Sequence, residues 1–351
     1  MELRRHTIGL PARYVRIDNN SNILIIGQHL TSRTEAVRDF CLARAARVTV
    51  IALGAAFIDK KENHLFRYER GTMRGHRIFR HSILKKSKRH EYLVPATFLL
   101  YLFDIFRALV VLRRRYDVYI GISHFSGLIG VLLKCLGVCG KTIYYAIDYY
   151  APRKGAGSFK TMLLKQLENF TDSCAVFHSD EVWDISERIS EARHRFGGLK
   201  QERYGYKNRI APLGYSRGFF RNKEVRDIDR YAVVFIGVIV EGQGLELVLE
   251  VLPEIRKHIP GIKIKVIGTG PFLARFKEQV QKAGLNSLFT FYGFVESNEA
   301  MLDIVASSAI GISLWDNRDN KLNNSYFGDP GKTKLYSVCG LPVIVSNDTV
   351  Y

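Results

Sequence analysis

Short apolar runs alternate along the chain with longer segments in which apolar residues recur at helical spacing. In the first half this pattern predicts helices at 34–45, 127–136 and 159–170, and strands at 22–27, 47–53, 118–122, 142–147 and 173–177, with a further element at 180–186. Strands that alternate with helices are typical of a parallel, doubly wound sheet. The first half is therefore expected to form a Rossmann-like α/β domain, although the single Gly27 after its first strand is too little for a dinucleotide-binding fingerprint.

A second series of the same kind follows a polar stretch. It predicts helices at 245–258, 272–283 and 298–307, and strands at 232–237, 262–267, 288–292, 310–314 and 341–345. We place an N-terminal domain at 1–216, a linker at 217–230 and a C-terminal domain at 231–351. Domains of this type bind ligands at the carboxyl ends of their strands, so the two are expected to face each other across a cleft.

Charge is distributed unevenly over the two halves. The formal net charge is +18, and residues 1–215 hold 36 Lys and Arg against 19 Asp and Glu, whereas residues 216–351 hold 16 against 15. Such asymmetry indicates an anionic partner for the first half, either nucleic acid or an anionic membrane surface, and solubility is the plainer interpretation. The chain carries no recognised nucleic-acid-binding motif, so no nucleic-acid partner is expected.

Residues 67–115 are the predicted contact with an anionic membrane surface, with a simple solvated face as the alternative. Residues 67–89 carry nine Lys and Arg against one acid, and the apolar stretch 92–112 follows. That stretch approaches the length of a membrane span, but Asp104 and Arg107 lie within it and could pair on one helix face. A buried or interfacial helix is therefore expected, in a cytoplasmic protein that is peripheral on the inner face of the cell membrane.

A glycine-containing loop in the second half has the composition of a phosphate-binding turn. Gly268-Thr-Gly-Pro follows a predicted strand, precedes a helix, and lies 31 residues after Gly237 and 25 before Gly293. A glycine backbone can approach a phosphate or a ribose where a side chain would obstruct it.

The stretch 326–346 has a second signature of anion binding. A charged loop with Asp329, Lys332 and Lys334 leads into a short helix, which Gly340 ends before an apolar strand. The N-terminus of a helix presents free backbone N–H groups to an anion, and the two lysines add positive charge.

The ordered series of these motifs resembles the GT-B glycosyltransferases of the family-4 type, also called glycosyl transferases group 1. The resemblance covers about 230–346 and extends more faintly over 20–215. It implies a GT-B fold, and transfer of a sugar, with retention of configuration, from a nucleotide sugar to a membrane-linked or polysaccharide acceptor. It implies no cofactor beyond that co-substrate and no metal, and the five cysteines also lack the spacing of a zinc site.

The resemblance also implies candidate site residues. A histidine that contacts the donor sugar near the reacting centre corresponds to His124; an incidental histidine in a loop capped by Ser123 is the alternative. Acceptor contacts are expected from Asp148 and Arg153. Packing of the neighbouring aromatic residues Tyr149 and Tyr150 is an equally good explanation of this segment. The predicted donor-binding residues are Gly237, Gln243, Gly268, Thr269, Gly270, Asp329, Lys332 and Lys334.

Three positions depart from the family pattern. Val238 and Gln243 stand where the family has an arginine and a lysine that neutralise the donor diphosphate. Leu335 stands where a glutamate accepts hydrogen bonds from the ribose. Valine and leucine can bind neither group, and glutamine brings a hydrogen bond but no charge.

Two accounts of these departures are open. In one, Lys332 and Lys334 replace the missing cations and Asp329 makes a polar contact with the sugar or ribose. In the other, the chain is a catalytically degenerate GT-B protein that binds glycan or lipid, or acts as a scaffold for a partner. The sequence ends at Tyr351, five residues after the last motif, so the C-terminal domain is expected to be truncated.

Overall fold

The computed structural model describes most of the chain, namely residues 14–28, 32–54, 62–80, 102–109, 114–149, 159–221, 223–315 and 324–346. The chain divides into two compact units. The first comprises residues 1–30 and 37–212, and the second comprises residues 31–36 and 213–351. By this division the predicted linker, 217–230, lies within the second unit.

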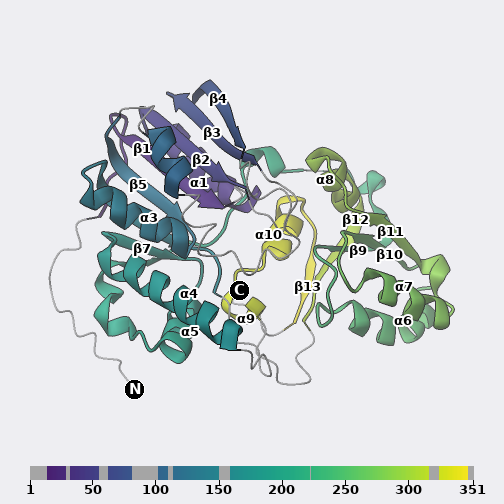
Figure 1. The fold of residues 1–351 in the computed structure, drawn as a ribbon. Coiled ribbons are helices and arrows are strands. Elements are labelled where there is room, and N and C mark those ends of the chain that lie inside the picture. Colours follow the sequence, from purple (N-terminus) through teal and green to yellow (C-terminus); the bar gives the residue numbers. More distant parts are fainter. Residues whose placement is uncertain are drawn as a thin grey trace, which may run out of the picture. The chain divides into compact units, whose positions relative to one another are not determined.

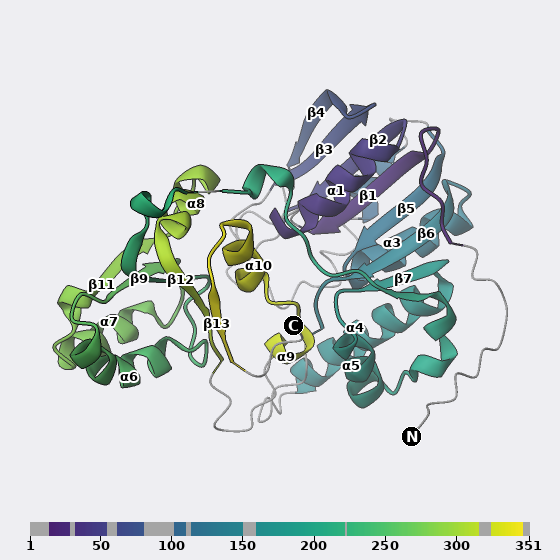
Figure 2. The same ribbon diagram turned by 180° about the vertical axis from the view of Figure 1, so that it is seen from behind.

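An eight-stranded sheet forms the centre of the first unit, in the order β4-β3-β2-β1-β5-β6-β7-β8 (Figures 1 and 2). Neighbouring strands are parallel except that β3 is antiparallel to both β2 and β4, and β3 and β4 form a hairpin at one edge. The strands are β1 Asn22–Gln28, β2 Arg47–Leu53, β3 Glu62–Glu69, β4 Thr72–Arg80, β5 Tyr116–Ile122, β6 Cys139–Ala146, β7 Glu181–Asp184 and β8 Asn208–Ile210. The helices include α1 Ser32–Arg44, α3 His124–Cys135, α4 Phe159–His178 and α5 Arg188–Gly197.

The central strands of this sheet are continuous apolar runs because helices cover both of its faces. Ile23 to Ile26 in β1 and Ile120 and Ile122 in β5 are at most 1% exposed. The predicted α/β class of the first unit is confirmed.

Two parts of the first unit differ from the sequence-based prediction. The strand predicted at 173–177 is wrong, because these residues are the last turns of α4. A short apolar run fits a buried helix as well as a strand, and here Ala175 and Val176 pack inward from the helix. The arginine-rich residues 67–80 form most of the β3–β4 hairpin, which turns at Arg70 and Gly71 with positive φ at both (45° and 75°).

Residues 102–109 are helical and belong to an apolar cluster with residues of β2, β3 and α3. Asp104 accepts a hydrogen bond from Asn63 Nδ2 (3.0 Å), and the Arg107 guanidinium lies over the ring of Phe103. The rest of the predicted helix 92–112 lies outside the described residues. Within the described part of the chain, every helix is too short or too polar to cross a membrane.

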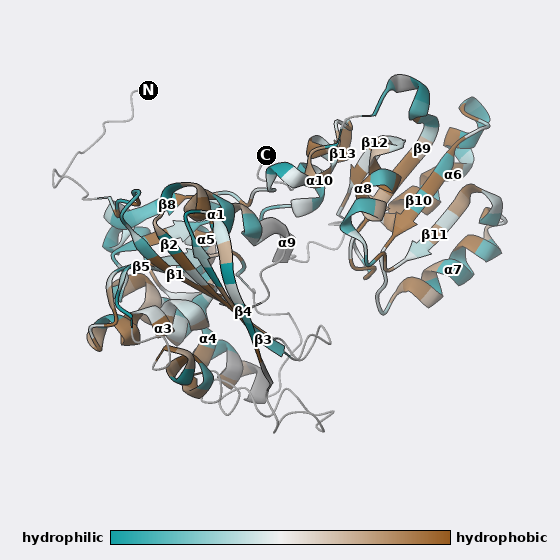
Figure 3. Ribbon diagram, turned by 90° about the horizontal axis from the view of Figure 1, so that it is seen from above, coloured by the Kyte–Doolittle hydropathy of each residue, from teal (hydrophilic) through white to brown (hydrophobic). Residues whose placement is uncertain are grey.

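The second unit is built on a five-stranded parallel sheet in the order β11-β10-β9-β12-β13. One apolar cluster joins the sheet to α6 and α7, and another joins it to α8 and α10, so helices cover both faces. Accordingly, α6 and α7 show hydrophilic and hydrophobic colours side by side (Figure 3). The elements are β9 Asp229–Ile236, α6 Leu245–His258, β10 Lys263–Ile267, α7 Leu273–Lys282, β11 Phe289–Gly293, α8 Asn298–Ala306, β12 Ser308–Ser313, α9 Asn324–Phe327, α10 Gly331–Val338 and β13 Val343–Val345.

Candidate functional site

Each of the two sheets has a topological switch point, where the crossovers leave a central strand in opposite directions. Ligands of such sheets bind outside the carboxyl ends of the strands at that point. In the second unit the central strand is β9, between β10 and β12, and in the first unit it is β1, between β2 and β5. Side chains near the ends of β9 and β12, and of β1 and β5, are therefore the candidates for ligand contact.

Lys332, in the first turn of α10, places its ammonium group at the switch point of the second unit. Its Nζ donates a hydrogen bond to Gln243 Oε1 (2.9 Å). The same Nζ lies 4.2 Å from the ring centroid of Phe235, in β9, and 5.0 Å from that of Trp315, just after β12. Because aromatic faces attract cations, two rings and one amide hold this charge between the two strand ends. Sequence analysis does not single out either ring, although a tryptophan directly after a predicted strand is an available signal.

Tyr336 fixes the helix that carries Lys332. Its hydroxyl donates to Ile312 O (3.1 Å) in β12 and accepts from Ile236 N (3.0 Å) in β9, which ties α10 to both strands. Its ring lies against Gly311, where a Cβ would stand 2.3 Å from a ring carbon. Residues four apart share a helix face, so Lys332, one turn earlier, is directed to the same strand ends.

The predicted glycines bring two loops together without intervening side chains. Gly268 has φ +131°, and a Cβ there would stand 1.9 Å from the carbonyl oxygen of Gly237. Gly237 has φ +146°, and a Cβ there would stand 2.8 Å from Lys332 Cε. A Cβ at Gly270 would stand 2.2 Å from a backbone oxygen of the facing loop, and the exposed Thr269 accepts a hydrogen bond from that loop through its carbonyl (2.9 Å). The packing of the loops therefore requires these glycines, and it leaves the Gly237 backbone beside Lys332.

Asp329 and Lys334 form an arrangement separate from Lys332. The Asp329 side chain is buried, and its Oδ2 accepts hydrogen bonds from Lys334 Nζ and from Leu213 N (2.7 Å). Lys334 Nζ also donates to Leu213 O (2.7 Å), so the pair binds both backbone groups of Leu213, with which residues 213–351 begin. Asp329 Oδ1 is buried without a hydrogen bond among the described residues. The contacts of this pair are those of a structural clamp, and its role in donor binding stays a prediction.

Packing also accounts for Leu335. It is 4% exposed and belongs to the apolar cluster beneath α10, so this position stabilises the helix and offers no ribose contact. Val238 is 60% exposed on the loop after β9 and carries no charge. Gln243 brings no charge, and its Oε1 accepts the hydrogen bond from Lys332 Nζ.

His124 opens α3 at the carboxyl end of β5, at the switch point of the first unit. Burial lowers its pKa below the ordinary 6.5, and the carboxylates of Asp172 and Glu168 offset this only in part. Its Nε2 is buried and makes no hydrogen bond within the described part of the chain. Ser123, at the N-cap position, has φ +83° and donates its N–H to Tyr145 O (3.0 Å), but its hydroxyl does not cap the helix. The capping role that the alternative interpretation gives to Ser123 is therefore wrong.

A buried ionic network lies next to this histidine, and sequence analysis does not find it. Arg193, 1% exposed, donates to Asp172 (2.9 Å) and to both carboxylate oxygens of Asp184 (2.7 and 2.8 Å). Tyr144 Oη donates to Asp172 (2.6 Å), and Asn208 Nδ2 donates to Asp184 (2.6 Å). Burial lowers the pKa of Arg193, but the two carboxylates outweigh it and hold that pKa well above its usual value. The network joins β6, β7 and β8 to α4 and α5.

The two predicted acceptor residues have different outcomes. Asp148 is exposed just after β6, near the carboxyl edge of the first sheet. Arg153 lies outside the described residues. Tyr149, beside Asp148, is buried and donates to Asn169 Oδ1 (3.1 Å). Its ring stacks on that of Phe196 (6.3 Å between centroids), which is aromatic packing of the kind that the alternative interpretation expects.

A protein-family model described as Glycosyl transferases group 1 matches residues 216–313. This segment, which lies in the second unit, is similar to that family. The matched segment ends at the last residue of β12, so it includes Gly237, Gln243 and Gly268 but not Lys332. At the level of sequence, none of the curated proteins matches the chain.

Three solved structures are similar to the chain along most of its length. The catalytic domain of Starch Synthase IV from Arabidopsis thaliana, bound to ADP and acarbose, is 10% identical with a TM-score of 0.64, over 93% of this chain and 83% of that one. Anabaena Alr3699/HepE, in complex with UDP, is 13% identical with a TM-score of 0.58, over 93% and 81%. The lipopolysaccharide outer core galactosyltransferase WaaB, in its apo form, is 12% identical with a TM-score of 0.53, over 93% and 81%. The predicted GT-B fold is thereby confirmed.

The group 1 family and the GT-B fold together support sugar transfer as the general activity. Lys332 and the glycine loops lie on the sheet of the second unit. His124 lies on the other sheet of the same fold.

Proposed function

We propose that this GT-B protein transfers a sugar from a nucleotide-sugar donor to a glycan or lipid-linked acceptor, and that Lys332 binds the donor diphosphate. The position of Lys332 carries the proposal. Its Nζ lies between the ends of β9 and β12, over two aromatic rings and beside a glycine backbone that leaves no room for a side chain.

The chemistry of the leaving group explains why a cation is needed there. Negative charge grows on the diphosphate as the bond to the sugar breaks, and a fixed positive group stabilises this charge more in the transition state than in the ground state. Lys332 supplies the positive group, and the N-terminal N–H groups of α10 add to it. The proposal handles this charge without a metal ion or another cofactor.

The first unit supplies the acceptor side in this proposal. Because burial lowers the pKa of His124, the imidazole is neutral near pH 7 and can exchange hydrogen bonds with a sugar hydroxyl. Asp148 would contact the acceptor from the same edge of the sheet. Transfer would retain configuration, with the leaving diphosphate assisting deprotonation of the acceptor. The acceptor would be membrane-linked or a polysaccharide, met at the inner face of the cell membrane.

Isothermal titration with UDP-, ADP-, GDP- and dTDP-sugars tests the proposal. The relatives Alr3699/HepE and Starch Synthase IV hold UDP and ADP, so sugars of these two nucleotides come first. We expect at least one donor to bind, and Lys332→Met to weaken it by about tenfold to a hundredfold, since a hydrogen bond to a charged group is lost. Lys282→Met, on the exposed end of α7, is the matched control and should bind as the wild type does. The proposal fails if no donor binds, or if Lys332→Met binds undiminished.

The buried Leu335 favours a second candidate function, a non-catalytic GT-B protein that binds glycan or lipid. Without a ribose-binding acid at this position, the donor would be held by its diphosphate alone. The discriminating measurement is release of free sugar from a labelled donor that binds. Slow hydrolysis or transfer supports the enzyme, whereas binding of glycans without any turnover of any donor supports the second candidate.

A further inference from the structure

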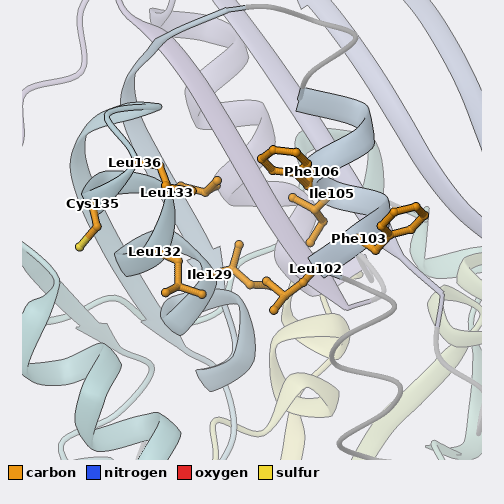
Figure 4. A pocket seen from close by; sticks show the side chains of 9 residues that line it. All are labelled: Leu102, Phe103, Ile105, Phe106, Ile129, Leu132, Leu133, Cys135 and Leu136. Atoms are coloured by element: carbon orange, nitrogen blue, oxygen red, sulfur yellow. The ribbon is translucent and has the colours of Figure 1, made fainter.

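An apolar groove of about 420 Å³ opens on the first unit between helix 102–109 and α3 (Figure 4). Phe103 and Phe106 line it from one helix, and Leu132 and Leu136 line it from the other. These four side chains are 58%, 56%, 40% and 65% exposed, respectively. All nine lining side chains end in carbon or sulfur, so the weak donor of the Cys135 thiol is the strongest side-chain hydrogen-bonding group that this lining offers a ligand.

The grouping of these residues distinguishes the groove from an ordinary surface. Single exposed apolar residues are normal in soluble proteins, but several large ones around one hollow mark an interaction site. Phe103 and Phe106 are three apart, and Leu132 and Leu136 are four apart, so each helix presents one apolar stripe to the groove. Ile105 and Leu133 also line the groove, one from each helix, and both belong to the buried apolar cluster of the first unit. The two helices that form the groove are therefore held in place by the core.

Positive charge flanks the groove on the same face of the sheet. Leu65 of β3 packs in the cluster with helix 102–109, so alternate residues of β3 face that helix, and Arg67 continues this row. Arg77 of β4 is paired with Leu65 and is exposed on the same face. Arg107 is exposed on the helix itself and lies over Phe103.

We propose that this groove takes the hydrocarbon chain of a bilayer lipid whose anionic headgroup is bound by Arg67, Arg77 and Arg107. An apolar hollow on a sheet face that also carries guanidinium groups is complementary to such a lipid, because the chain leaves water while the phosphate is paired. The inference rests on the proposed function in one respect, since it would bring the enzyme to the membrane that holds a lipid-linked acceptor. Binding of a plain lipid can nevertheless be measured without any donor.

Co-sedimentation of the full chain with vesicles tests the apolar part of the site. The vesicles contain phosphatidylcholine alone or phosphatidylcholine mixed with phosphatidylglycerol. We expect the wild type to bind the mixed vesicles, and the double variant Phe103→Ser with Phe106→Ser to bind them about tenfold more weakly or worse. Phe170→Ser is the matched control, because Phe170 is 63% exposed on α4 of the same unit. This control should bind as the wild type does.

A second variant tests the charged part. Arg77→Gln with Arg107→Gln should reduce the preference for phosphatidylglycerol and the sensitivity of binding to salt, since fewer cations face the headgroups.

The native thiols give a readout that needs no substitution. Cys135 lines the groove and is exposed, whereas Cys174 is half-buried on α4. Mixed vesicles should slow the alkylation of Cys135 and leave that of Cys174 unchanged.

Three outcomes would overturn the inference. One is wild-type protein that ignores both kinds of vesicle, and another is a Phe103/Phe106 variant that still binds them fully. The third is a wild-type dimer that this variant dissociates, which would assign the groove to a second copy of the chain. Titration of the same proteins with nucleotide sugars keeps the two proposals apart. Vesicle binding without donor binding counts against the proposed function alone, and donor binding without vesicle binding counts against the groove alone.

Discussion

The switch point of the first unit holds a half-buried histidine whose pKa is lowered by burial, whereas that of the second unit holds a half-buried lysine beside two aromatic rings. Both lie at the carboxyl ends of parallel strands, so the sheet geometry is the same. The difference comes from what packs beside them. His124 Nε2 is buried, and the nearby carboxylates of Asp172 and Glu168 are paired with Arg193 and Lys165. Lys332 is supported by aromatic faces and an amide. The comparison teaches that the same edge of one fold can hold an imidazole or an ammonium group, according to which side chains pack beside it.

The largest expected effect comes from removing the pairing in the first unit. Arg193→Met leaves the buried carboxylates of Asp172 and Asp184 without their cation, so we expect a loss of about 3–5 kcal/mol in the free energy of unfolding. Denaturant unfolding followed by circular dichroism measures the change. Arg195→Met, two residues on and exposed, is the control and should change stability by less than about 0.5 kcal/mol. Equal stability of the Arg193 and Arg195 variants would show that the network does not support this switch point.

The second prediction separates two lysines of α10. Lys334→Met removes the partner of the buried Asp329 and of Leu213 O, so we expect it to lower the free energy of unfolding by about 1–3 kcal/mol. Lys332→Met should change stability much less, because its charge is half-buried at the strand ends. Thermal unfolding of both variants checks this. If the order is reversed, Lys332 is the structural residue and the contrast between the units is lost.

The smallest effect concerns pH. The folded-state pKa of His124 lies below its ordinary 6.5, so below that pH the unfolded chain binds a proton that the folded chain does not. His124 therefore has no effect on stability well above pH 6.5 and lowers stability as the pH falls through 6.5 toward the folded-state pKa. Unfolding of the wild type and of His124→Asn between about pH 5.5 and about pH 8 measures this, and the variant should show a flatter profile. Parallel profiles would mean that the histidine is not held neutral.

Much of the fold follows from the sequence because apolar runs and glycine stops report local structure. The strand at 47–53 and the helix at 245–258 have the predicted bounds. Prediction of secondary structure fails where packing against other elements selects between a helix and a strand. Residues 173–177 are apolar in either a helix or a strand, and only their packing against α3 selects the helix. The edge strand β4 carries three arginines and two adjacent apolar residues near its end, so it lacks the regular alternation by which a strand is predicted.

The candidate site is less predictable, because its side chains meet across long stretches of sequence. The sequence shows that Lys332 brings a cationic side chain to this loop. It does not show the contact with Gln243, because the two residues are 89 positions apart. Asp329 and Lys334 lie in the same charged loop and helix start as Lys332, so the sequence suggests the same role for all three. In the structure, however, Asp329 and Lys334 bind the backbone of Leu213, from which they are separated by 116 and 121 residues, respectively. A local pattern cannot distinguish a lysine that meets a ligand from one that holds backbone.

The clamp on Leu213 also has a consequence for the order in which the protein is made. Leu213 leaves the ribosome 116 residues before Asp329, which takes on the order of ten seconds at ordinary rates of synthesis. During that interval the N–H and C=O groups of Leu213 bond to water instead, while β9, the middle strand of the second sheet, is already available for pairing. The second sheet can therefore begin to pair at its central strand before the backbone groups of Leu213 are bound by Asp329 and Lys334.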